Sequence, residues 1–131
     1  MMLHHVSIVV TDLDRSVAFY RDVFGIEQIE RPPFNSVGAW FACGALQIHI
    51  ILNPAGTFRR AATIDTTDGH FAFRTDDFDG CVNDLIAKGF REDAPEGDPW
   101  RLRVRRNGPA GFLQAYLLDP DRNIVEINGA P

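Results

Sequence analysis

The chain has 131 residues, the length of a single domain, and its 45% apolar and 24% charged residues are ordinary for a globular protein. Its formal net charge of −5 argues against a dedicated binder of nucleic acid or of a membrane surface, because both need a basic field. No apolar run approaches the roughly 20 residues of a membrane span, and the first residues lack the basic start of a secretory signal. Cys43 and Cys81 lie far apart, so the sequence suggests two reduced, partly buried thiols in a cytoplasmic protein.

The first half of the chain predicts a strand, a helix and further strands. Residues 5–10 form a short apolar, β-branched run that is typical of a strand. Asp12 is a good helix N-cap, and Gly25 can take the left-handed conformation that ends a helix. Between them, one apolar stripe follows helical spacing through Leu13, Val17, Tyr20 and Phe24. Extended, aromatic-rich segments follow at residues 38–43 and 46–52.

The second half shows the same order of signals. Residues 71–75 predict a strand, Asp77 a helix N-cap and Gly89 the end of that helix, whose buried stripe is Phe78, Val82 and Leu85. Extended segments are expected at residues 101–105, 112–118 and 124–128. The sequence therefore predicts one domain of two modules, about residues 1–53 and 69–131, joined by a linker of about residues 54–68.

A weak internal repeat supports this division. His5 aligns with His70 and Asp12 with Asp77, each 65 residues apart, and the closing segments 44–50 and 121–127 align at an offset of 77. The second alignment places His49 on Glu126. The prediction is an α+β fold of tandem βαβββ modules.

The repeat also groups four candidate metal ligands. Pseudo-twofold packing of the modules would bring His5 near His70 and His49 near Glu126. Glu126 lies in an apolar strand, where a carboxylate costs several kcal/mol unless it is paired with an arginine or bound to a cation. Two or three imidazoles with one carboxylate suit Zn, Fe, Mn, Co or Ni. His4 is expected to face away from His5, because side chains alternate along a strand.

Segments 4–25, 69–80 and 112–127 resemble the glyoxalase/bleomycin resistance/extradiol dioxygenase (vicinal oxygen chelate) superfamily, and the resemblance covers nearly the whole chain. It implies curled mixed sheets that form a cup around a divalent metal, with His5, His70 and Glu126 as ligands. His49 falls where glyoxalase I enzymes place a fourth ligand. The chain departs from the family at Arg122-Asn123, where a glycine usually follows the Asp-Pro-Asp turn, so the turn geometry is open. A homodimer is expected by resemblance, with the site formed within one chain or across two.

Further side chains are candidates for substrate binding. Phe112, Gln114 and Tyr116 share one face of a predicted strand, and Tyr116 resembles in position a tyrosine that lines the pocket of extradiol dioxygenases. Trp40 is a candidate apolar wall, as are Phe73 and Trp100, although aromatic residues in such folds often belong to the core. Arg103 alternates with Arg101 and Arg105. These arginines either line a solvated edge strand or bind a carboxylate or phosphate of the substrate.

Three functions follow for a small-molecule substrate. The first is a metal-dependent glyoxalase-like lyase or isomerase that chelates a small oxygen-rich metabolite through adjacent oxygens, with Glu126 as the base. The second is an Fe(II) extradiol-type ring-cleavage dioxygenase, and the third is a metal-free resistance protein that binds a drug or metabolite. A thiol transferase of the fosfomycin-resistance type shares the three-ligand pattern and is a further alternative.

Overall fold

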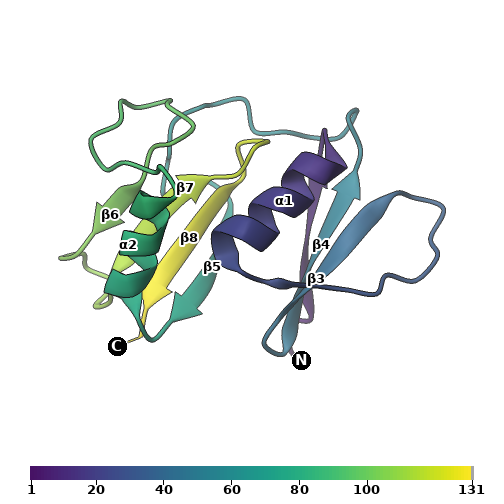
Figure 1. The fold of residues 1–131 in the computed structure, drawn as a ribbon, viewed down its shortest axis with the longest axis horizontal. Helices are drawn as coiled ribbons and strands as arrows, with labels where there is room; N and C mark the ends of the chain where they lie inside the picture. Colours follow the sequence, from purple (N-terminus) through teal and green to yellow (C-terminus); the bar gives the residue numbers. More distant parts are fainter. Residues whose placement is uncertain (131) are drawn as a thin grey trace. The chain divides into compact units, whose positions relative to one another are not determined.

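The structure, a computed structural model, describes residues 1–130, and the chain divides into two compact units that meet between Phe58 and Arg59. Each unit carries one helix and one four-stranded mixed sheet in the order βαβββ (Figure 1). The first unit contains β1 (His5–Val10), α1 (Leu13–Phe24), β2 (Glu27–Ile29), β3 (Gly38–Cys43) and β4 (Leu46–Leu52). The second unit contains β5 (His70–Thr75), α2 (Phe78–Ala87), β6 (Arg103–Arg105), β7 (Gln114–Leu118) and β8 (Ile124–Gly129). The predicted α+β fold of tandem βαβββ modules is confirmed.

The two sheets have the same topology. The strand order is β1-β4-β3-β2 in the first unit and β5-β8-β7-β6 in the second. In each sheet the opening strand pairs in parallel with the closing strand, and the remaining pairs are antiparallel. The helix of each unit packs on one face of its sheet, as α1 does through the fully buried ring of Tyr20 against Phe41. We call the face without the helix the open face; in the second unit it also carries the buried apolar cluster that Tyr116, Leu118 and Ile124 form with Ile64.

Local capping explains where the helices begin and end. The Asp12 carboxylate accepts a hydrogen bond from the Arg15 backbone N–H at 3.0 Å, and Gly25 takes a φ of 64° at the end of α1. At the end of α2, Gly89 has a φ of 106° and the Phe90 N–H donates to the Leu85 carbonyl, which is a Schellman motif. Both predicted glycine terminators are confirmed.

The sequence-based expectations differ from the structure at the short strands. The βαβββ pattern predicts a strand at the position of β2, but the residues do not show where it lies. β2 has only three residues, two of them exposed, and its sequence shows no alternation of apolar and polar residues. β7 begins at Gln114 rather than at residue 112, since a turn in which Gly111 has a φ of 79° precedes it. β6 is shorter than the expected segment 101–105, and Arg101 makes only an isolated bridge with Arg91.

Both cysteines are free and half-buried, as expected, and burial raises the pKa of the Cys43 and Cys81 thiols. Within residues 1–130, neither helix has the length and apolar character that a membrane crossing requires.

Candidate functional site

In the first unit, the open face brings together two of the predicted ligands. His49 lies at the middle of β4, where it pairs with Ser7 of β1 and Trp40 of β3. His5 lies two residues before Ser7, so it shares this face. The imidazole of His49 is 8% exposed and stacks between two rings, with its centroid 4.1 Å from that of His5 and 4.0 Å from that of Trp40. The predicted wall residue Trp40 therefore lies directly beside the predicted ligand pair.

The surroundings of His49 favour the neutral imidazole. Burial is the largest cause that lowers its pKa, and the positive charges of His5, His4 and Arg31 lower it further. Its Nε2 lies 2.8 Å from the Gln47 side-chain oxygen, which only accepts, so Nε2 donates and Nδ1 keeps a lone pair. A neutral imidazole with a free lone pair is the form that binds metal ions.

The expectation that His4 faces away from His5 is wrong. Their Nδ1 atoms lie 3.0 Å apart and the two rings meet edge to face. The physical reason is that β1 begins at His5, so His4 precedes the strand and the alternation of strand side chains does not apply to it.

In the second unit, the open face holds the other two predicted ligands. Glu126 lies at the middle of β8, where it pairs with Ala72 of β5 and Tyr116 of β7, the positions that correspond to Ser7 and Trp40 of the first unit. His70 lies two residues before Ala72, and its Nε2 is 3.1 Å from Glu126 Oε2. Glu126 is 5% exposed, and among the described residues its ion-pair partner is His70 rather than an arginine.

The hydrogen bonds of His70 show why this pair fits a cation. His70 Nδ1 lies 2.8 Å from the Asp68 carbonyl oxygen, which only accepts, so Nδ1 carries the ring proton. In the neutral ring the Nε2 lone pair then faces a carboxylate oxygen, and two acceptors this close need a proton or a metal ion between them. Their 3.1 Å separation is near the roughly 3 Å expected for neighbouring ligand atoms that each lie about 2.1 Å from one ion. A histidine that donates its other N–H to a carbonyl is also the usual arrangement of a metal ligand.

Tyr116 and Gln114 surround the Glu126 carboxylate. The Gln114 side-chain amide donates to Glu126 Oε1 at 3.0 Å and to the Tyr116 hydroxyl at 2.7 Å. Burial is the largest cause that raises the pKa of Tyr116, and the negative charge of Glu126 raises it further. Tyr116 therefore remains a neutral phenol at physiological pH, with a proton that it can donate.

Of the other predicted binding residues, some lie on the open face with Glu126 and others lie outside it. Arg103 pairs with Tyr116 across β6 and β7, and one of its guanidinium nitrogens donates to the Ile64 carbonyl. Phe112 lies before β7 and not on it as predicted, and its ring lies under the guanidinium of Arg74. Trp100 packs on Phe90 in the loop after α2, and with Leu118 of β7 it lines a pocket that contains none of the predicted ligands.

The departure from the family pattern at Arg122 is accommodated by the backbone. Within residues 1–130, Arg122 is the one non-glycine residue with a positive φ, at 69°. Asp119 stabilises this turn, because its Oδ1 accepts hydrogen bonds from the backbone N–H groups of Asp121 and Asn123. Arg122 therefore takes the left-handed conformation that glycine adopts most readily, and the turn forms without a glycine.

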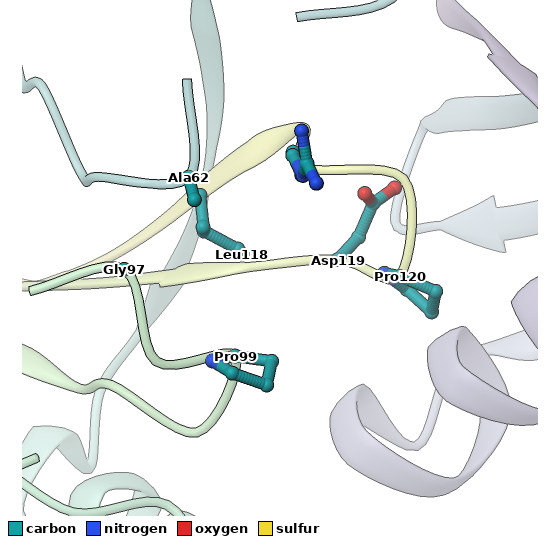
Figure 2. Close-up of a pocket in the computed structure, with 7 residues that line it drawn as sticks. Ala62, Gly97, Pro99, Leu118, Asp119 and Pro120 are labelled. Atoms are coloured by element: carbon teal, nitrogen blue, oxygen red, sulfur yellow. The ribbon is translucent and has the colours of Figure 1, made fainter. Parts of the chain in front are cut away.

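A pocket of about 270 Å³ lies beside this turn. Figure 2 shows it between the end of β7, which leads into Asp119 and Pro120, and the loop that carries Gly97 and Pro99. Its lining contains none of the residues predicted for the site. The pocket therefore does not mark the open-face cluster around Glu126.

The structure thus gathers the predicted ligands as two pairs, one in each unit. Among residues 1–130, no three His, Cys, Asp or Glu side chains gather at the spacing that holds a metal ion. The four-ligand set stays a prediction. Its two pairs would come either from one chain or from two chains of a dimer. Two partners of these pairs carried no signal in the sequence, namely the Gln47 side chain and the Asp68 carbonyl.

Comparison with known proteins places the chain among relatives of similar architecture. The family model described as "Glyoxalase/Bleomycin resistance protein/Dioxygenase superfamily" matches residues 2–127. The chain has a TM-score of 0.77 and 24% identity to the crystal structure of a putative glyoxalase family protein from Bacillus anthracis, covering 100% of this chain and 96% of that one.

Three curated relatives are similar in sequence. The chain is 28% identical over 127 residues to Glyoxylase I 4 of Arabidopsis thaliana, covering 95% of this chain and 68% of that protein. It is 28% identical over 130 residues to Lactoylglutathione lyase GLX1 of the same plant, covering 94% of this chain but spanning only 42% of that protein. It is 26% identical over 129 residues to Glutathione transferase FosA of Serratia marcescens, covering 96% of this chain and 79% of that protein.

Proposed function

Because the chain belongs to the glyoxalase/bleomycin resistance protein/dioxygenase superfamily, we propose that it is a metal-dependent vicinal oxygen chelate enzyme. Its activity would be that of a glyoxalase-like lyase or isomerase acting on a small oxygen-rich metabolite. The observation that carries the proposal is the His70–Glu126 pair, in which a ring lone pair and a carboxylate oxygen face each other at 3.1 Å. The sequence similarity of this chain to Glyoxylase I 4 and to Lactoylglutathione lyase GLX1 favours the lyase hypothesis.

The proposed ligands are His5 and His49 from the first unit and His70 and Glu126 from the second. A divalent ion of the Zn, Fe, Ni, Mn or Co type would supply a Lewis acid for two adjacent substrate oxygens. Each unit contributes one pair, so the site is complete either within one chain or between the two chains of a homodimer.

Glu126 is the proposed base. It would take the proton from the hydroxyl-bearing carbon of a hydroxy-carbonyl substrate and return it to the neighbouring carbonyl carbon, while the hydroxyl proton passes to the former carbonyl oxygen, so that the two carbons exchange oxidation states and no atom is gained or lost. Glu126 is buried, its described ion-pair partner is His70 rather than an arginine, and the Gln114 amide orients one of its oxygens.

The remaining predicted residues would position the substrate. The neutral phenol of Tyr116 and the guanidinium of Arg103 would donate hydrogen bonds to substrate oxygens, because both lie on the open face with Glu126. Trp40 would give the substrate a flat apolar wall beside His49. Phe112, which lies before β7, remains a predicted contact of the substrate.

A thiol transferase is the second candidate. The similarity to Glutathione transferase FosA over 79% of that protein favours it. So do Arg103 and Arg105, two half-buried arginines that make no ion pair within the described residues and could bind an anionic substrate group.

The test combines metal content with activity. Protein reconstituted with Zn²⁺, Ni²⁺, Mn²⁺ or Fe²⁺ is assayed with the hemithioacetal of methylglyoxal and glutathione, with fosfomycin and glutathione, and with a catechol and O₂. Turnover of the hemithioacetal that E126Q and H70A abolish is the expected result. Turnover in the second assay selects the transferase, catechol cleavage with Fe²⁺ selects the dioxygenase, and a wild-type protein that binds no metal selects the metal-free binder.

Mixing of variants tests whether the site is shared between chains. H5A and E126Q each remove a ligand from a different unit, so each is expected to be inactive alone. A mixture of the two regains activity only if a ligand pair from one chain completes that of another. The expected control is D76A, which leaves activity unchanged because Asp76 is exposed in the loop before α2 and is outside the proposed ligand set.

A further inference from the structure

Arg31 is a half-buried cation without an anionic partner. It lies between β2 and β3, and it makes no ion pair within the described residues. One guanidinium nitrogen donates to the Ser36 hydroxyl at 2.8 Å, whereas its Nε is buried and has no hydrogen-bond partner. A buried donor without an acceptor costs free energy, so its presence calls for an explanation.

The guanidinium lies at one end of a row of rings on the first unit. It sits 4.9 Å from the centroid of Phe34, whose ring lies 5.8 Å from that of Trp40, and Trp40 in turn stacks on His49. Phe34 is 56% exposed, so its ring lies largely in solvent and not in the hydrophobic core, where phenylalanine is usually found.

The backbone is shaped to hold this arginine. A Cβ at position 38 would lie 2.3 Å from the Ile50 carbonyl oxygen and 3.3 Å from Arg31 Nε. Only glycine at this position lets β3 approach β4 while the Arg31 side chain lies across it. The Ser36 hydroxyl and the Phe34 ring orient the guanidinium, and its planar fork matches the paired oxygens of a carboxylate or phosphonate.

We propose that Arg31, flanked by Phe34 and Trp40, is an anion-recognition subsite of the proposed metal site. The molecule that the enzyme accepts then carries an anionic oxygen group, a carboxylate or a phosphonate, next to a flat apolar portion. The anionic group binds the terminal guanidinium nitrogens of Arg31, because Nε is buried, and the apolar portion lies on the exposed Phe34 ring beside Trp40. This inference rests on the proposed function for its link to catalysis, but the subsite itself does not need the metal.

The test uses phenylphosphonate, which combines a flat ring with an anion, and metal-free protein. In a W100F background Trp40 is the remaining tryptophan, because the chain has two, so its fluorescence reports binding next to Arg31. R31Q should weaken phenylphosphonate binding about tenfold or more, the loss expected for one charge-assisted hydrogen bond. R31K keeps the charge but loses the fork, and it should fall between wild type and R31Q. R21Q removes an exposed arginine of the same unit and should bind like wild type.

Two results would overturn the inference: dissociation constants of R31Q and wild type that agree within about twofold, or no wild-type binding at about 10 mM phenylphosphonate. Binding of benzyl alcohol as tight as that of phenylphosphonate would also overturn it, because the anion would then contribute nothing. Mn²⁺ binding by the same variants separates this inference from the proposed function. R31Q should bind Mn²⁺ like wild type, and a wild-type protein without Mn²⁺ affinity refutes the metal-dependent function while the phenylphosphonate comparison still decides the subsite.

Discussion

Replacement of Asp119 by alanine should destabilise the protein strongly, because this carboxylate holds the turn between β7 and β8. Asp119 is 4% exposed. Its Oδ1 accepts from the backbone N–H groups of Asp121 at 2.9 Å and Asn123 at 2.8 Å, and its Oδ2 accepts from the Asn123 side-chain amide at 2.7 Å. The same turn holds Arg122 in a left-handed conformation, which costs about 1 kcal/mol for a residue with a side chain.

The magnitude follows from the three lost hydrogen bonds. At about 1 to 1.5 kcal/mol each, D119A should lower the free energy of unfolding by about 3 to 4.5 kcal/mol. For a chain of this length that corresponds to a fall in Tm of about 10 to 15 °C. D119N keeps one acceptor oxygen for the two backbone N–H groups, so it should lose about 1 kcal/mol.

Urea denaturation followed by circular dichroism measures these differences, with thermal unfolding as the second readout. D76A is the matched control, because Asp76 is exposed in the loop before α2, and its change should stay within about 0.5 kcal/mol. A D119A midpoint that matches that of D76A at an unchanged m-value would refute the reasoning.

Three further predictions concern the environment of the site and its support. His49 in the metal-free protein should titrate below the ordinary pKa of histidine in ¹H NMR, and H5A should raise the pKa of His49. Because the unfolded chain binds this proton more readily than the folded chain, the free energy of unfolding should fall as the pH drops below about 6.5. A free energy of unfolding that rises there would contradict the sign of the pKa shift. Tyr116 should titrate above the ordinary pKa of tyrosine in ¹³C NMR, and E126Q should lower that pKa; no change in E126Q would mean that the charge of Glu126 does not reach the phenol. G38A should cost about 1 to 3 kcal/mol in urea denaturation, because its Cβ would meet the Ile50 carbonyl at 2.3 Å, whereas G69A, whose Cβ meets nothing within 4 Å, should be neutral; equal stability of the two variants would refute this packing argument.

The parts of the fold that the sequence predicts correctly are those with local causes. Asp12 and Gly25 act through hydrogen bonds and backbone conformation within one turn of the helix, so their residue types suffice to place the ends of α1. β2 escaped prediction because a three-residue edge strand depends on its partner strand for its existence, and its own residues show no alternation.

The site shows the same division. The repeat predicted that His49 corresponds to Glu126, and the strand registers agree, because Ser7 lies opposite His49 and Ala72, 65 residues after Ser7, lies opposite Glu126. The importance of Arg31 could not be predicted, since it arises from the close approach of β3 and β4 at Gly38 and from the position of the ring of Phe34. Such features depend on tertiary packing and leave no periodic signal in the sequence.

Titration with Mn²⁺ followed by electron paramagnetic resonance, on wild type, H5A, E126Q and D76A, tests the central claim most directly. If ligands from both units hold one ion, H5A and E126Q should each lose about 100-fold or more in affinity, beyond the 10- to 100-fold typical of groups that only orient a ligand. D76A, which changes an exposed residue before α2, should bind like wild type. Wild-type affinity in H5A together with lost affinity in E126Q would contradict the account, because the second unit would then hold the ion alone.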